Sequence, residues 1–436
     1  MHPRNPYKKP LDFSALASVF WPLKEFLITT SEGSSVVDFK DPDAQRCLTR
    51  ALLKRDFDIE LTLPEDRLCP PVPNRFNYVL WLQDIFRSEK VEDTVEEPFI
   101  LIDIGTGASS VYPLLGCSVE PSWNFIGTDI DTTSLDWARR NVSANNLSHR
   151  ISLELVNSSG PIFKPLFDDS TLMVGFTMCN PPFYSNLEEV AESKQLKEYE
   201  PFAVCTGSEN EMITAGGEVA FVKQMVVESL ELRTRCRWYT SMLGKLSSVI
   251  KVVDFLKECE VSNYALTQFV QGTTRRWAIA WSFGLLRLDD AFSRFQSPSL
   301  QAWMPLPNNF VHTMPFVESG DLLVSTQVIL SAIPGLSHKV KDSDRRTIVV
   351  CSSGNTWSRA ARRKAGTSSA QLTPDAPLMM RCDISVSEDE RHNTGPSSLI
   401  LKGRWSWGSD RTLWDSFWHH LTRKLRERFN TSTNTT

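Results

Sequence analysis

The chain has 436 residues, of which 41% are apolar and 23% are charged, a composition typical of a globular protein large enough for two domains. No apolar run is long enough to cross a membrane, and the N-terminal residues lack the apolar segment of a secretory signal. The nine cysteines show no paired CxxC spacing, which argues against a disulfide framework and a zinc site. The sequence therefore predicts an intracellular protein, nuclear or cytoplasmic, with no metal and no membrane partner.

Charge is unevenly distributed along the chain. The formal total is −5, yet residues 337–436 carry 17 Lys and Arg against 10 Asp and Glu, a local charge of +7 that leaves −12 for the remainder. A basic terminal region on an acidic body is typical of a protein with a polyanionic partner such as a nucleic acid. A solvated charged surface accounts for the same numbers, so charge alone leaves both readings open.

The N-terminal part of the chain predicts an arm followed by helices. Apolar residues over 13–21 have the spacing of a short amphipathic helix, and we expect residues 1–40 to form an N-terminal arm. Asp41, as an N-cap before a proline, predicts a helix over 41–57. The further expected elements are a strand over 59–63, a proline-rich loop over 70–74 and a helix around 78–82.

Strand patterns alternate with helical patterns in the middle of the chain. Apolar runs at 99–103 and 172–176 have the length of buried strands, and similar runs occupy 124–128 and 151–155. This alternation predicts a parallel sheet with helices on both faces. The expected remainder is a mobile loop over 187–213, a helix over 218–233, a strand over 238–243, a helix over 249–259 and a strand over 277–283.

The C-terminal part predicts a separate, smaller domain. Residues 291–310 are rich in Ser, Pro and Gln, which indicates a linker between a domain over 41–290 and one over 311–436. The second domain is expected to be α+β. Its predicted elements are strands at 322–329, 347–351 and 398–407, a basic segment at 359–364, a disordered insertion at 366–377 and a terminal helix at 413–429.

A glycine loop follows the strand at 99–103. The glycines of Asp103-Ile104-Gly105-Thr106-Gly107 let the backbone turn tightly and approach a ligand closely. Asp129 ends the next strand, where an acidic side chain can accept both hydroxyls of a ribose. Ser110 stands where the dinucleotide pattern GxGxxG has its last glycine. The loop and the acid together predict a nucleoside cofactor and favour S-adenosylmethionine over NAD.

A second motif, Asn180-Pro181-Pro182-Phe183, follows the strand at 172–176. An exocyclic amine on an aromatic ring is a weak nucleophile because its lone pair is delocalised. The Asn180 side-chain oxygen and the Pro181 carbonyl can accept its two N–H bonds, and the prolines stiffen the segment without adding donors. Phe183 offers a face on which a flipped base can stack. These four residues are the predicted catalytic group, and a proline-rich strand exit is the alternative.

The two motifs together resemble the methyltransferase-like protein 16 family, the adenine-N6 methyltransferases of U6 small nuclear RNA, whose bacterial relatives methylate 23S ribosomal RNA. The resemblance covers about residues 1–285. Further matching segments occur in the same order: Met1-His2-x-Arg4-Asn5-x-Tyr7-Lys8, Val72-Pro73-x-Arg75-x-Asn77-Tyr78, Gly216-Gly217-Glu218-Val219-x-Phe221-Val222-Lys223, Arg237-Trp238-Tyr239 with Met242-Leu243-Gly244-Lys245, and Gln271-Gly272-x-Thr274-x-Arg276-Trp277-Ala278.

This resemblance implies an α/β fold, a Rossmann-like class I methyltransferase with a smaller C-terminal α+β domain that binds RNA. It implies that S-adenosylmethionine is the cofactor, that the methyl group goes to the exocyclic amine of an adenosine in structured RNA, most specifically U6, and that a nuclear location is favoured. The implied site residues are Arg75, Asp103, Gly105, Gly107, Ser109, Asp129 and Ser158 for the cofactor, Asn180, Pro181, Pro182 and Phe183 for catalysis, and Arg4, Lys8, Arg235, Arg237, Lys245, Arg275 and Arg276 for RNA.

Three positions depart from the family pattern. Asp129 replaces a more familiar Glu, so Asp131 can share the ribose contact; the loop at 156–159 lacks the lysine that obstructs the cofactor site in some relatives; and Thr273 stands where relatives carry arginine. Two other functions stay open. One is a protein glutamine N-methyltransferase, because a glutamine amide presents the same pair of N–H bonds, and the other is a non-catalytic RNA-binding protein of the same fold.

Overall fold

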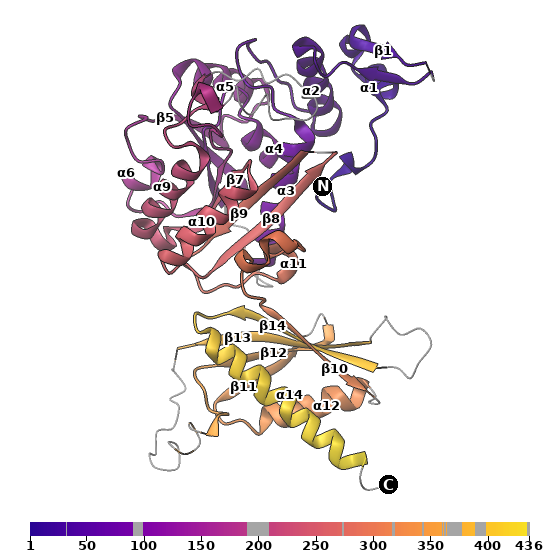
Figure 1. Cartoon of the computed structure of the whole chain (residues 1–436), viewed down its shortest axis with the longest axis vertical. Helices are drawn as coiled ribbons and strands as arrows, with labels where there is room; N and C mark the ends of the chain where they lie inside the picture. Colours follow the sequence, from indigo (N-terminus) through magenta and orange to yellow (C-terminus); the bar gives the residue numbers. More distant parts are fainter. Residues whose placement is uncertain are drawn as a thin grey trace. The chain divides into compact units, whose positions relative to one another are not determined.

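Two compact units make up the structure, a computed structural model that describes residues 1–31, 33–89, 99–189, 209–272, 274–315, 319–341, 344–359, 361, 363, 377–388 and 398–433. Unit 1 comprises Met1–Gly284 and Arg294–Pro305, and unit 2 comprises Leu285–Ser293 and Leu306–Thr436 (Figure 1). The stretch predicted as a linker, 291–310, is divided between the two units. This stretch contains helix α11 (Asp290–Ser293) and the 3-10 helix η4 (Pro298–Trp303), and its buried Leu300 and Met304 belong to the core of unit 1.

A seven-stranded sheet in the order β5-β4-β3-β6-β7-β9-β8 forms the centre of unit 1. The first five strands in this order run parallel, and β9 and β8 form an antiparallel hairpin at one edge. The predicted Rossmann-like α/β fold is thereby confirmed. The strands are β3 (Phe99–Ile104), β4 (Trp123–Asp129), β5 (Ile151–Leu155), β6 (Val174–Cys179), β7 (Cys236–Leu243), β8 (Tyr264–Gln271) and β9 (Thr274–Trp281).

Helices cover both faces of this sheet (Figure 1). On one face, α9 and α10 bury aliphatic side chains against Ile102 and Ile279. On the other, Phe86 of α3 packs edge-on against the rings of Phe99, Trp123 and Phe176. The remaining elements of unit 1 are η1 (Pro6–Lys8), α1 (Phe13–Val19), η2 (Trp21–Phe26), β1 (Leu27–Thr29), β2 (Ser35–Val37), α2 (Pro42–Phe57), α3 (Val72–Glu89), α4 (Val111–Val119), α5 (Thr132–Ala144), α6 (Lys164–Asp168), α8 (Glu209–Met212), α9 (Gly217–Leu232), η3 (Arg233–Arg235) and α10 (Leu246–Glu258).

Two local predictions for unit 1 are wrong. Residues 59–63 form no strand. The side chains of Asn141 in α5 and of Asn145, directly after α5, accept the N–H groups of Thr62 and Glu60 at 2.8 Å each and satisfy this backbone instead. The proline-rich loop at 70–74 ends inside α3, whose first turn tolerates proline because its N–H groups have no partner within the helix. The edge strand β8 was not predicted at all.

The strand order reverses at β3, which lies between β4 and β6. Within this arrangement Ile104 pairs with Thr128 on one side and with Cys179 on the other. The segments that follow these three residues therefore leave the sheet side by side. In open α/β sheets, ligands bind in the crevice at such a reversal, beyond the carboxyl ends of the strands.

A five-stranded antiparallel sheet in the order β10-β14-β13-β12-β11 forms unit 2 together with two main helices. Its strands are β10 (Asn309–Pro315), β11 (Leu336–Lys341), β12 (Asp344–Ser352), β13 (Met380–Glu388) and β14 (Ser398–Trp407), and its helices are α12 (Ser319–Ser331) and α14 (Arg411–Thr433). The sequence predicted β12, β14 and α14 but missed β10, β11 and β13. The insertion predicted at 366–377 lies outside the described residues except at Pro377.

The strand predicted at 322–329 is a helix, α12. A strand would bury every second residue, including Val324 and Val328, which are 56% and 46% exposed. Instead Leu322, Thr326 and Leu330 are fully buried, four residues apart, as on one face of a helix. The run of β-branched residues favoured a strand locally, and packing against the rest of unit 2 overrode that preference.

No helix within the described ranges is long and apolar enough to span a bilayer. The same ranges contain no group of three or more His, Cys, Asp or Glu side chains arranged to hold a metal ion.

Candidate active site

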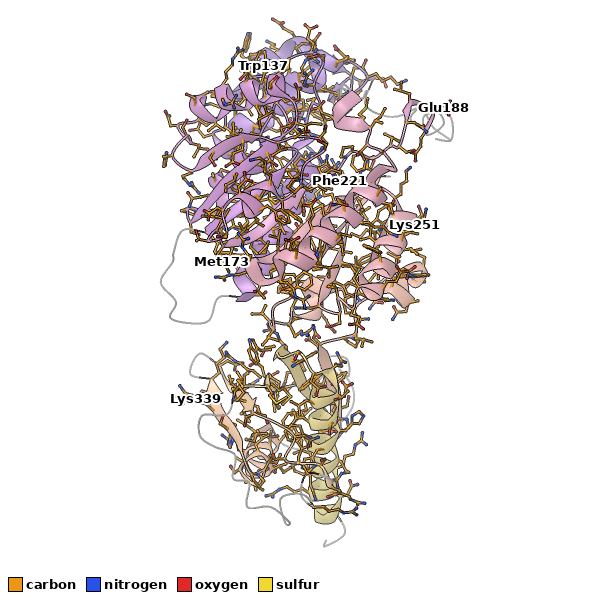
Figure 2. All side chains as sticks on the ribbon, turned by 90° about the vertical axis from the view of Figure 1, so that its left-hand side faces the viewer. Trp137, Met173, Glu188, Phe221, Lys251 and Lys339 are labelled. Atoms are coloured by element: carbon orange, nitrogen blue, oxygen red, sulfur yellow. The ribbon has the colours of Figure 1, made fainter. Side chains whose placement is uncertain are left out.

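A cavity of about 210 Å³ lies at the reversal point of the central sheet. Its walls come from the loops after β3, β4, β5 and β6, from the segment before α3 and from residues 211–214. Phe221 of α9 also lines it, and Figure 2 shows this side chain far from Met173, which precedes β6 at the opposite edge of the sheet. The predicted residues that line the cavity are Arg75, Gly105, Gly107, Ser109, Asp129, Ser158, Asn180 and Pro182.

The glycine loop has the backbone geometry that its sequence indicated. Gly105 and Gly107 have φ values of +67° and +63°, in the left-handed region that favours glycine. A Cβ added at Gly105 would meet no atom within 4 Å, so this backbone faces open space. The loop can therefore approach a ligand closely along the cavity floor.

Asp129 is the acid at the end of β4. Its carboxylate accepts the N–H groups of Gly107 at 2.8 Å and Asp131 at 2.9 Å, and burial raises its pKa. The neighbouring Asp131 pairs with Arg67 at 2.8 Å and caps α5 through the N–H of Thr133. Asp131 is thus committed to the protein, which favours Asp129 as the acceptor for a ligand hydroxyl.

Asp103, the one acidic residue of β3, is 1% exposed, and neither of its carboxylate oxygens has a hydrogen-bond partner among the described residues. Burial, aided by the charge of Asp129, raises its pKa to about 7, and the nearby Thr106 side chain and the Arg75 guanidinium oppose this shift. Arg75 donates to the hydroxyl of Tyr112 at 3.1 Å. A buried, unpaired carboxyl beneath a cavity favours a ligand that is cationic or rich in hydrogen-bond donors.

Asn180 directly follows β6, and its side-chain oxygen is buried without a hydrogen-bond partner among the described residues. The adjacent Pro181 is also buried. Phe183 rests on the backbone of Gly244, where an added Cβ would lie only 2.8 Å from the ring. The loop after β6 therefore presents the Asn180 oxygen, without a partner among the described residues, at the cavity wall, while the Phe183 ring lies against Gly244 and is not among the lining residues.

Two positioning contacts near this motif were not predicted. Glu218, 2% exposed at the start of α9, accepts the N–H groups of Gly244 at 2.6 Å and Lys245 at 3.1 Å, and so holds the backbone beneath Phe183. Tyr184 forms two backbone hydrogen bonds, one with Met212 at the end of α8 and one with Thr214 just after it. Both contacts join residues more than 25 positions apart, so no local pattern could have revealed them.

Three of the predicted RNA-binding cations lie at the same end of the sheet as the cavity, where the parallel strands finish. Arg275 and Arg276 begin β9, and the guanidinium of Arg276 lies 5.7 Å from the centre of the Phe183 ring. Lys245 follows β7, forms an ion pair with Glu189 and lies 5.5 Å from the Tyr184 ring. Arg275 is exposed. These side chains form a basic rim beside the catalytic motif.

The other predicted RNA-binding cations lie elsewhere. Arg235 donates to the Asp169 and Leu172 carbonyls, and Arg237 lies 4.9 Å from the Phe99 ring. Both arginines therefore lie at the end of the sheet where the parallel strands begin, opposite the cavity. Arg4 is bound to Gln83, Asp84 and the Leu80 carbonyl of α3, and Lys8 donates to the Pro3 carbonyl at 3.3 Å. The seven cations therefore do not lie together, and their roles in RNA binding stay predictions.

A larger hollow of about 800 Å³ lies on unit 2 along α14. Basic and aromatic side chains line it: Arg359, Arg423, Arg426, Trp357 and Trp418. Arg426 contacts His312, whose pKa is lowered by burial and by that arginine. The hollow lacks the strand-end loops and glycine backbone of the cavity in unit 1, and its chemistry suits anion binding rather than catalysis.

Sequence and structure comparisons place these features in a family. Residues 1–284 match the family described as RNA methyltransferase. The chain is 36% identical over 409 residues to the "U6 small nuclear RNA (adenine-(43)-N(6))-methyltransferase" of Schizosaccharomyces pombe, a match that covers 92% of this chain and 98% of that protein. Vertebrate relatives match over 65% of this chain, which spans about half of their length, 51% for the relative from Gallus gallus.

Solved structures of human METTL16 resemble unit 1. The catalytic domain in complex with the MAT2A 3'UTR hairpin 1 aligns with a TM-score of 0.60 and 39% identity, covering 65% of this chain and 95% of that one. The N-terminal domain in complex with SAH aligns with a TM-score of 0.54 and 37% identity, covering 65% and 98%. The glycine loop, the Asn180 motif and these matches lead to one conclusion: the chain belongs to the RNA methyltransferase family.

Proposed function

We propose that the protein is an S-adenosylmethionine-dependent adenine-N6 methyltransferase of structured RNA, with U6 small nuclear RNA as its substrate and the nucleus as its location. The observation that carries this proposal is the buried, unpartnered side-chain oxygen of Asn180 beside the glycine loop. A buried acceptor without a partner costs folding free energy, about 1–3 kcal/mol, which a substrate N–H recovers on binding. The relatives described above act on the same class of amine.

The residues around the cavity fit this cofactor. S-adenosylmethionine supplies, when bound, a methyl group on a positively charged sulfur that a neutral amine can attack. Asp129 would accept the ribose hydroxyls, and the unpaired Asp103 would stabilise positive charge from beneath. Arg75 would pair with a carboxylate, and the left-handed backbone of Gly105 leaves room for close approach.

The Asn180 motif would prepare the amine. Its side-chain oxygen and the Pro181 carbonyl accept the two N–H bonds, which draws electron density toward the nitrogen and fixes its direction. No charged base is required beforehand, because the proton can leave after the nitrogen has become cationic. Phe183 would stack on the adenine after it has left the RNA stack, and Gly244 leaves the space that this ring occupies.

RNA would approach over the basic rim of Lys245, Arg275 and Arg276. Arginine can pair with phosphates through two N–H groups and stack on bases. Unit 2 would add a second contact, because arginines and tryptophans that line one hollow are typical of a surface for a phosphate backbone. The basic rim also favours RNA over a protein glutamine as the substrate.

Replacing Asn180 tests the catalytic role. In Asn180→Ala the amine loses an acceptor, so we expect methyl transfer to fall at least about 100-fold while RNA affinity stays within about threefold. Labelled cofactor and total RNA provide the measurement, with Asn124→Ala on β4 as an amide-matched control. Label that appears in protein alone would contradict the RNA assignment, and an active Asn180→Ala protein would contradict the role of the motif.

The raised pKa of Asp103 predicts pH-dependent cofactor binding. With a pKa of about 7, this carboxyl is mostly protonated at pH 6 and ionised at pH 8, so affinity for the cationic cofactor should rise through this range and then level off. The free energy of unfolding without cofactor should fall as pH rises from about 4 to 7, since the folded pKa exceeds the unfolded value of about 3.9. Calorimetry at each pH measures the cofactor affinity and the free energy of unfolding. In Asp103→Asn, the cofactor affinity should not change with pH over this range.

The separation of the cations predicts unequal effects on RNA binding. Arg275→Ala should weaken binding several-fold and reduce the slope of log affinity against log salt by about one phosphate contact. Arg237→Ala removes the same charge at the opposite end of the sheet and should leave the RNA affinity and its salt dependence unchanged. Fluorescence anisotropy with an RNA hairpin at several salt concentrations measures them; equal losses in the two variants would place RNA on both edges.

The hollow of unit 2 is tested in the same assay. Arg359 is exposed and lines it, so Arg359→Ala should weaken hairpin binding and lower the salt slope. Arg345→Ala, which removes another exposed arginine at the start of β12, is the matched control. If the two variants bind alike, the hollow takes no part in RNA recognition.

A further inference from the structure

Glu211 lies at the cavity wall beside the glycine loop. One carboxylate oxygen is 3.6 Å from the place that a Cβ at Gly107 would occupy. The other accepts the N–H of Leu68 at 3.1 Å, in the segment before α3. The carboxylate thus bridges two walls of the cofactor cavity, although residues 187–213 were predicted to be only a mobile loop.

The catalytic motif holds this carboxylate in place. Tyr184, directly after Phe183, donates its N–H to the Met212 carbonyl at 3.0 Å, and its own carbonyl accepts the N–H of Thr214 at 2.9 Å. These two bonds flank Ile213, which pairs with Tyr184 as an isolated parallel bridge. The backbone next to Glu211 is therefore bonded to the substrate side of the cavity, while its carboxylate lies on the cofactor side.

The charges around the cavity favour a cation. Asp129, Asp131 and Glu211 line it, Asp131 is paired with an arginine, and Arg75 is the only cation among the described lining residues. Independently, Asp103 beneath the loop is 99% buried with both oxygens unpartnered in the described part of the chain, which points to a positively charged ligand.

We infer that Glu211 binds the cofactor and selects its charged, methyl-bearing form over the product. This inference rests on the proposed function. Methyl transfer breaks the bond between carbon and sulfur, the electron pair stays on sulfur, and the positive sulfonium becomes a neutral thioether. A carboxylate at the wall loses that attraction when the charge disappears, so the spent cofactor is held less tightly and exchanges for a fresh one.

The full-length variant Glu211→Gln separates charge from shape, because its amide oxygen can still accept the N–H of Leu68. Isothermal titration calorimetry would use S-adenosylmethionine, S-adenosylhomocysteine and sinefungin, whose amine replaces the sulfonium as a cation. We expect affinity for the two cationic ligands to fall about tenfold and affinity for S-adenosylhomocysteine to change less than about twofold. Glu211→Asp, which keeps the charge, should retain the preference for the cations.

Glu231→Gln removes an exposed charge at the far end of α9 and serves as the charge-matched control, with all three affinities unchanged. Equal losses for the three ligands in Glu211→Gln would overturn the inference and indicate a role in shape alone. Unchanged affinities would overturn it as well. A wild-type protein that binds none of the three ligands would refute the proposed function itself, so the two failures are distinguishable.

Discussion

The register of β3 between its two neighbours is the constraint on which the site depends. Because Ile104 pairs with both Thr128 and Cys179, the glycine loop, Asp129 and Asn180 leave the sheet at the same level. A shift by one residue would turn every side chain of β3 to the other face of the sheet and remove Asp103 from beneath the cavity. The apolar packing of unit 1 holds this register through strands that are buried on both faces.

Around this point, buried polar groups fall into two classes. Some are satisfied by the protein, as in the chain of contacts from the Tyr78 hydroxyl to Thr240 at 2.5 Å and on to the Thr177 carbonyl at 2.5 Å. Others, Asp103 and the Asn180 oxygen, have no partner among the described residues. The first class makes the scaffold rigid, and the second class leaves binding energy for ligands. Buried polar atoms without a partner therefore locate the site more precisely than burial alone does.

Local sequence patterns correctly predicted part of the structure. Continuous apolar runs predicted the parallel strands because such strands are buried on both faces, and glycines at positive φ marked the loop. The same reasoning failed at 322–329, where β-branched residues form α12, and at 59–63, where asparagine side chains replace a neighbouring strand. In both cases partners distant in sequence decided the local conformation.

Residue identities alone therefore specified the chemistry: a glycine loop with an acid for a nucleoside, and an asparagine beside prolines for a planar amine. They could not specify which cations share a surface. The charge of a side chain does not determine at which end of the sheet its strand begins. The antiparallel pairing of β9 with β7 puts the start of β9, with Arg275, at the opposite end of the sheet from the start of β7, with Arg237, and a helix of four residues brings Glu211 over Gly107. Those placements arise from strand direction and long-range packing, which exist only once the chain has folded.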